Sequence, residues 1–216
     1  PFLVMIKIHI LVSKFWYRNV ARFCTDAILE HVAQSTVDIV PAVISESAMR
    51  PSSIVCNSSI HPTLVLKLCS LWRDSLEHLH IQSPSCSDKY WQNILKMLRK
   101  KPLSVRLPGC RSSSLSLKTL ASKANQLLEL DLRNNDTDGI RDFSDKDIAE
   151  VLRSSPMLRH LNLSGNWHLS MKCLLGSSTN NLQNLSLETL HVNRDVWESE
   201  ILGKHRHSLR ALNLGR

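Results

Sequence analysis

Glycine is scarce in this chain, with 6 residues among 216. Neither a glycine-rich phosphate-binding loop nor a G-x-S-x-G nucleophile motif occurs. Asp145 and Asp147 are better explained as acids in the first turn of a helix than as a catalytic carboxylate pair. We therefore expect no catalytic residue, no enzyme activity and no cofactor.

Paired cysteines are lacking too. The six cysteines form no C-x-x-C pair and no regular framework, which favours a reduced, intracellular protein of the cytoplasm or nucleus. Cys110 and Cys173 fit turn and core positions better than they fit nucleophiles. His78-x-His80 and His205-x-His207 have the spacing of metal ligands, but neither pair has the further ligands that a site needs, so we predict no metal.

Long apolar runs are missing as well. Residues 2–12 (FLVMIKIHILV) are almost all apolar but fall short of the about 20 residues that span a bilayer. We expect a buried helix or strand there. The remnant of a signal peptide is the alternative, although no basic region and no small-residue cleavage site accompanies the run. The chain starts at Pro1 and stops at Arg216 without a polar cap, so we expect a fragment.

A repeated leucine motif is what the sequence does contain. Residues 127–135 (LLELDLRNN) and 158–166 (LRHLNLSGN) both fit L-x-x-L-x-L-x-x-N, the strand and turn of a repeat unit. Weaker copies bring the starts to positions 76, 102, 127, 158, 182 and 209, which are 24 to 31 residues apart. Pro102 replaces the first leucine of the second copy. Asn135 and Asn166 are expected to satisfy backbone groups in their turns, as is Cys110.

Helical periodicity fills the segments between these strands. In residues 88–98 and 144–155 the apolar positions recur every three or four residues, and Ser144 is placed to cap the second helix. Shorter segments are expected to place on inner helix faces Leu115, Leu117, Leu120, Ala121, Met171, Leu174, Leu175, Val196, Ile201 and Leu202.

The motif and its period resemble the leucine-rich repeat superfamily in its ribonuclease-inhibitor-like class, over about residues 74 to 216. The resemblance implies an α/β solenoid of about six repeats, the last truncated, with a parallel sheet on the concave face and helices on the convex face. Pro84 and Leu190 stand where the turn asparagine belongs, so those turns, like the one near Pro102, are predicted to be irregular.

Residues 1–72 are predicted to form a helical cap, and residues 73–216 the repeats. Helical periodicity covers residues 13–49, including Ile28 and Leu29, and a loop is expected at 50–62. A helical cap before repeats resembles the substrate-recognition subunits of cullin-type ubiquitin ligases. The cap lacks the L-P-x-E start of an F-box. In the segment nearest to an Elongin-binding box, Thr63-Leu64 is followed by Leu68 and Cys69, with the cysteine one position late.

The residues that alternate with the strand leucines point to the opposite, concave face. Solenoids usually bind other proteins on this face. The predicted partner-binding residues are His78, His80, Arg106, Glu129, Asp131, Arg133, His160, Asn162, Asn184 and Ser186.

The net charge of +8, from 27 basic and 19 acidic residues, raises a rival function. Basic residues at positions 96–106, with Trp91 on the same helix, could face a nucleic acid. Their places near helix C-termini have a structural explanation in the helix dipole, and acids share the concave face.

The sequence thus predicts a non-catalytic protein–protein interaction module, with a substrate adaptor for ubiquitin ligation as its sharper form. A nucleic-acid-associated protein and a fragment of a secreted or surface receptor remain the alternatives.

Overall fold

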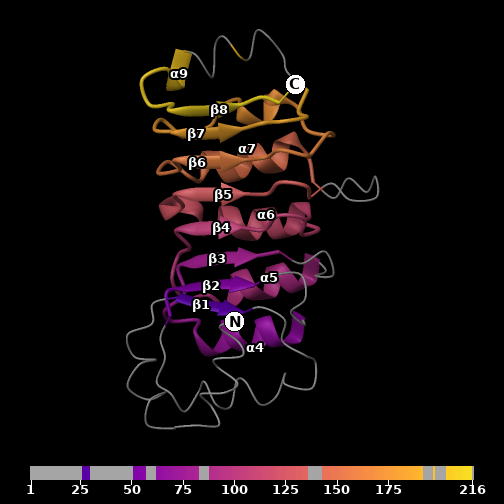
Figure 1. The fold of residues 1–216 in the computed structure, drawn as a ribbon, viewed down its shortest axis with the longest axis vertical. Helices are drawn as coiled ribbons and strands as arrows, with labels where there is room; N and C mark the ends of the chain where they lie inside the picture. The colour runs from indigo at the N-terminus through magenta and orange to yellow at the C-terminus, as the bar shows by residue number, and fades with distance from the viewer. Residues whose placement is uncertain are drawn as a thin grey trace.

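The computed structural model describes residues 26–29, 51–56, 62–82, 88–135, 143–191, 197 and 203–215. Eight parallel strands stack in chain order into one sheet, and successive helices pack behind it (Figure 1). The predicted α/β solenoid with a parallel sheet is therefore confirmed. The strands are β1 (Asp26–Leu29), β2 (Ser53–Cys56), β3 (His78–Ile81), β4 (Ser104–Arg106), β5 (Glu129–Asp131), β6 (His160–Asn162), β7 (Asn184–Ser186) and β8 (Ala211–Asn213).

Columns of apolar side chains run through the stack and form the core. The strands pair in register, so that Leu130 lies opposite Leu161, and Leu161 opposite Leu185. These three leucines are at most 2% exposed. Because strand side chains alternate between faces, the residues between the leucines point away from the core. All six strand starts predicted from the leucine motif lie at strands of this sheet.

The turns after the strands are held by side chains that bond to backbone carbonyls. Asn135 Nδ2 donates to the carbonyl oxygens of Leu107 (2.7 Å) and Leu132 (2.9 Å). Asn166 Nδ2 donates in the same way to Leu132 (2.9 Å) and Leu163 (2.7 Å). Each asparagine thus satisfies backbone groups in its own turn, as the sequence predicted, and it also joins that turn to the preceding one.

Cys110 occupies the asparagine's place in the turn before. Its Sγ donates to the carbonyl oxygen of Ile81 at 3.1 Å. In the next-to-last turn Leu190 takes the place and is buried instead. The turn near Leu190 keeps the left-handed residue of the other turns, since Thr189 has a φ of 73° and Gly165 in the corresponding place has 77°. It differs from the asparagine turns in having no side-chain amide to bond to the backbone, and Pro84 lies outside the described residues.

The helices are α4 (Pro62–Leu71), α5 (Asp88–Met97), α6 (Ser114–Ala121), α7 (Asp145–Arg153) and α9 (Gly203–His205), with short 3-10 turns at Ala124–Gln126 and Met171–Leu174. The predicted cap at Ser144 is present, and Ser144 donates from both its backbone N and its Oγ to Asp147 Oδ2. Acids also tie neighbouring units together, because Asp88 and Asp145 accept the backbone N–H groups of Ser113 and Ser170.

For two leucines the predicted position on an inner helix face is wrong. Leu115 is 57% exposed and Leu175 is 40% exposed. Leu115 lies in the first turn of α6, where Leu117 and Leu120 take the inner face. Leu175 follows a single 3-10 turn rather than a helix, so the helical period assumed for it does not apply. Val196, Ile201 and Leu202 lie outside the described residues.

The N-terminal part differs from the sequence prediction in two places. β2 lies within residues 50–62, where a loop was predicted, and β1 makes strand residues of Ile28 and Leu29, which were assigned to a helix. The motif signal is weak there: Pro51 stands in the leucine place before Ile54, as Pro102 does before Val105. The rest of residues 1–50 lies outside the described residues, and the predicted boundary at residue 72 stays a prediction.

We expect Leu161→Asp to lower the free energy of unfolding by about 4 kcal/mol or more, since it buries an unpaired carboxylate. Neighbouring repeats should melt with it, because each unit is stabilised by its neighbours. Asn184→Asp on the next strand makes a charge change at an exposed position and should cost within about 0.5 kcal/mol. Chemical denaturation followed by circular dichroism measures both. Equal effects of the two variants would show that the strand register is wrong.

Candidate functional site

The candidate site lies on the face of the sheet opposite the helices, which we call the strand face. It is formed by the residues of β3 to β8 that alternate with the buried ones, together with the turn residues that follow the strands. The ten residues predicted from the sequence all lie there, on β3 to β7 or in the turn after β5. Their accessibility varies: Arg133 and Asn184 are exposed, Asp131 is buried, and the others are half-buried.

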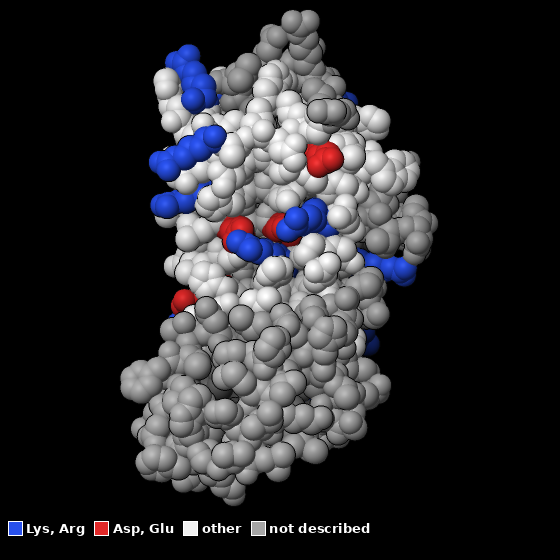
Figure 2. All heavy atoms as spheres, in the orientation of Figure 1, with Lys and Arg blue, Asp and Glu red and all other residues white. Residues whose placement is uncertain are grey.

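An open groove with a volume of about 410 Å³ hollows the strand face from β4 to β8. It brings together eight of the ten predicted residues, all except His78 and His80, which lie beyond it on β3. The groove also includes Ala211 and Asn213, which the same alternation places on β8. Figure 2 shows acidic and basic side chains next to one another in the middle of this face.

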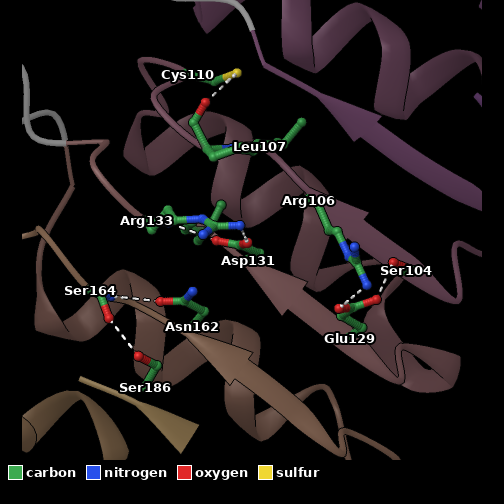
Figure 3. A network of polar contacts seen from close by, with 12 residues as sticks. Ser104, Arg106, Leu107, Cys110, Glu129, Asp131, Arg133, Asn162, Ser164 and Ser186 are labelled. Atoms are coloured by element: carbon green, nitrogen blue, oxygen red, sulfur yellow. Dashed lines mark hydrogen bonds and ion pairs between the residues drawn. The ribbon is translucent and has the colours of Figure 1, made fainter. Parts of the chain in front are cut away.

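Two ion pairs form one end of the groove, and we call them the central ion pairs. In the first, Arg106 Nη2 lies 2.7 Å from Glu129 Oε1. Glu129 Oε2 also accepts a hydrogen bond from Ser104 Oγ at 2.8 Å (Figure 3). Burial by itself would raise the pKa of Glu129, but the hydrogen bonds from Arg106 and Ser104 and the charge of Arg106 lower it below its usual range. Glu129 is therefore a carboxylate at neutral pH, with its charge balanced.

In the second pair, Arg133 Nη2 lies 2.8 Å from Asp131 Oδ2. Asp131 Oδ1 accepts the backbone N–H of Arg133 at 3.1 Å, which closes a tight turn at the end of β5. Asp131 is only 6% exposed as a result. The sequence expected this side chain to be open to a partner, but the turn and Arg133 occupy both of its oxygens.

The same turn bond recurs along the groove. Asn162 Oδ1 accepts the N–H of Ser164 at 3.0 Å, and Asn213 Oδ1 accepts that of Gly215 at 3.0 Å. These oxygens therefore shape the strand ends, while the Nδ2 group of Asn162 has no partner among the described residues. Ser186 Oγ lies 2.7 Å from Ser164 Oγ (Figure 3). Among the predicted residues on β6 and β7, Asn184 is exposed, whereas His160, Asn162 and Ser186 are half-buried.

The electrostatics suit non-covalent binding. Burial and the charge of Arg106 lower the pKa of His80 despite the opposing effect of Asp131, so its imidazole is neutral at neutral pH. Burial raises the pKa of Cys69 to about 12 and also raises that of Cys173, which leaves both thiols unreactive. Within the described ranges no group of three or more His, Cys, Asp or Glu residues is arranged to hold a metal ion.

The basic cluster that the sequence offered to a nucleic acid is largely neutralised. Arg99 pairs with Asp74 at 3.0 Å and Lys100 with Glu77 at 2.7 Å. Trp91, the candidate for base stacking, is 1% exposed and belongs to the core. The sequence could not show this, because the acids that neutralise the cluster come from the preceding repeat.

The comparisons with known proteins bear on the fold. No family model and no curated protein matches the chain. Among solved structures, a chain of the crystal structure of a Rad7 and Elc1 complex in yeast matches with a TM-score of 0.69 and 19% sequence identity. The match covers 93% of this chain and 53% of that chain, so this chain spans about half of its length. The likeness supports a repeat solenoid. None of the helices in the described part of the chain is long and apolar enough to cross a membrane.

We expect Glu129→Gln to lower the free energy of unfolding at neutral pH more than at low pH. A carboxylate with a lowered folded-state pKa contributes stability above its usual pKa of 4.5, and loses it as the pH falls through the folded value. The gap between wild type and variant should therefore be larger at about pH 6 than at about pH 3, as measured by urea unfolding.

The control is Glu150→Gln on α7, a half-buried glutamate with no ion pair to a described residue. Its gap from wild type should change less with pH. A Glu129→Gln gap that stays constant from pH 6 to pH 3 would contradict the stabilising role of the Arg106–Glu129 pair.

Proposed function

We propose that this protein is a non-catalytic recognition module of the leucine-rich repeat, ribonuclease-inhibitor-like type, which binds a partner protein on its strand face. One observation carries the proposal: a continuous groove crosses five successive strands and is lined by polar and charged side chains, four of which form two ion pairs. Such a surface presents fixed hydrogen-bonding groups on a rigid scaffold, which is how solenoids recognise proteins.

We propose that the groove binds its partner and does not catalyse a reaction. Its two carboxylates are engaged in ion pairs, Glu129 with Arg106 and Asp131 with Arg133. The buried thiols of Cys69 and Cys173 are held protonated by burial. An intracellular location agrees with the buried thiols of Cys69 and Cys173.

Within this function, a substrate-recognition subunit of a cullin-type ubiquitin ligase is the sharper form. It rests on two observations. One is the predicted order of helices and repeats in the sequence. The other is the similarity of the fold to a chain from a crystallised complex of Rad7 and Elc1. The segment nearest to an Elongin-binding box does not support α4 as the contact, because Leu64, Leu68 and Cys69 are all fully buried in the core. An adaptor would have to bind elsewhere on the chain.

We expect a photo-crosslinking residue in place of Asn184 to give a discrete covalent adduct with a partner protein in cells. Asn184 is exposed on the strand face, whereas Lys118 is exposed on α6 behind the sheet. The same photo-crosslinker at Lys118 is therefore the matched control. Mass spectrometry of the adducts identifies the partner. Equal adducts from both positions, or none from Asn184, would argue against recognition by the strand face.

For the ligase form, we expect the chain to co-elute with Elc1 on size-exclusion chromatography after co-expression. A substrate receptor has to hold its adaptor stably enough to survive dilution at micromolar concentration. Separate elution of the two proteins would reject an Elc1-type adaptor and leave recognition by the strand face standing. The Asn184→Asp variant is the control, because a change in the groove should not disturb an adaptor that binds elsewhere.

A further inference from the structure

Basic residues gather along one edge of the sheet. Asp74 and Glu77 are the only acids in the segments that lead into β3 to β8. These segments are residues 72–77, 98–103, 121–128, 153–159, 175–183 and 203–210. Both acids are already paired with basic residues of the next segment. The rest of the positive charge on this edge is therefore not balanced locally, and Figure 2 shows basic side chains along the edge beside the upper half of the strand face.

One position of each repeat brings this charge next to the groove. It is the residue directly after the first leucine of the motif, and its occupants from β3 to β8 are Glu77, Leu103, Leu128, Arg159, Gln183 and Arg210. Arg159 and Arg210 are exposed, and neither makes an ion pair with a described residue. The basic members of this column thus flank the part of the groove formed by β6, β7 and β8.

The helix dipole does not account for these two arginines. α7 ends at Arg153 and α9 ends at His205, and the dipole acts within the last turn of a helix. The backbone carbonyl of Arg159 already belongs to the sheet, where it accepts the N–H groups of Gln183 and Asn184. That pairing fixes the backbone of Arg159 at the start of β6, one residue before His160, which lines the groove.

Between the two arginines the groove is lined by no acid, lysine or arginine. It presents His160, Asn162, Asn184, Ser186 and Asn213, while the acids Glu129 and Asp131 at its far end are neutralised by the central ion pairs. Glu188 is exposed at the opposite edge, 3.5 Å from Asn213 Nδ2. The groove is therefore positive on one side and amide-rich along its middle.

We propose that the half of the groove formed by β6 to β8 binds an extended, acidic segment of a protein, with its carboxylates on Arg159 and Arg210 and its backbone on the amide side chains of the floor. Adjacent strands lie about 4.8 Å apart, and Arg159 and Arg210 belong to strands two spacings apart, so their Cα atoms are separated by about 10 Å. An extended peptide with acids at alternate positions sets carboxylates about 7 Å apart on one side, within reach of two long side chains. This inference rests on the proposed function and names the chemistry of its partner.

A nucleic acid fits this part of the strand face less well. No phenylalanine, tyrosine or tryptophan lines the groove, and binding of single strands draws much of its affinity from stacking on aromatic residues.

The test is fluorescence anisotropy with the full chain and a labelled peptide of about twelve residues in which glutamate alternates with serine. The double variant Arg159→Glu/Arg210→Glu should weaken binding about tenfold or more, since two attractive contacts become repulsive. Arg159→Gln/Arg210→Gln should weaken it in the same direction by a smaller factor. The matched control is Lys89→Glu/Lys146→Glu, which changes the net charge equally on the helices behind the sheet and should leave binding unchanged.

Three results would overturn the inference. The first is no binding of the acidic peptide, and the second is an equal loss of binding in both charge-reversed variants. The third is that a single-stranded oligonucleotide of the same charge binds more tightly than the peptide and that Arg159→Glu/Arg210→Glu weakens its binding. A peptide with glutamine in place of glutamate should not bind. Crosslinking from Asn184 is independent of the partner's charge, so adducts there without binding of the acidic peptide would reject this inference alone and leave the proposed function intact.

Discussion

In-register pairing of short parallel strands is the constraint on which the rest of this structure depends. Each strand of β4 to β8 has only three residues. Because side chains alternate between the two faces of the sheet, a shift of the pairing by one residue would exchange every core side chain for a surface one. The buried leucines oppose such a shift, because each fills a place between its neighbours above and below. The turn asparagines oppose it too, since Asn135 and Asn166 bond to the carbonyl groups of two successive turns.

The same pairing decides what the strand face presents. Residues 24 to 31 positions apart in the sequence are brought side by side, as Arg106 and Asp131 are on β4 and β5, or Asp131 and Asn162 on β5 and β6. The Arg106–Glu129 ion pair then forms across repeats, and together with the Arg133–Asp131 pair it neutralises both acids at one end of the groove. Charge that finds no neighbour of opposite sign, as at Arg159 and Arg210, remains for a partner. Under the proposed function, partner specificity would depend on which repeats leave their charges unbalanced.

Much of the architecture could be predicted from the leucine motif. The six strands from β3 to β8, the helices α5 and α7, the cap at Ser144 and the turn roles of Asn135, Asn166 and Cys110 are all local patterns, and local patterns survive in a sequence. β1 and β2 were missed because Ala27 and Pro51 stand at or before them in place of leucines, and the apolar spacing around them also fits a helix. Leu115 and Leu175 were misplaced because a helical period was assumed where the helix had only begun or was a single 3-10 turn.

By itself, the sequence determined which residues face the core and which face the groove, because alternation along a strand is a property of a few consecutive residues. It did not determine which groove residues are available. Asp131 and Asn162 have the same outward register as Asn184, yet their oxygens are taken up by the turns that follow them. In the sequence, Arg99 and Lys100 belong to an unpaired basic cluster. In the structure they form ion pairs with Asp74 and Glu77 of the preceding repeat. Only the tertiary structure decided these points, since electrostatic and hydrogen-bonding partners are chosen by distance in space and come from other repeats.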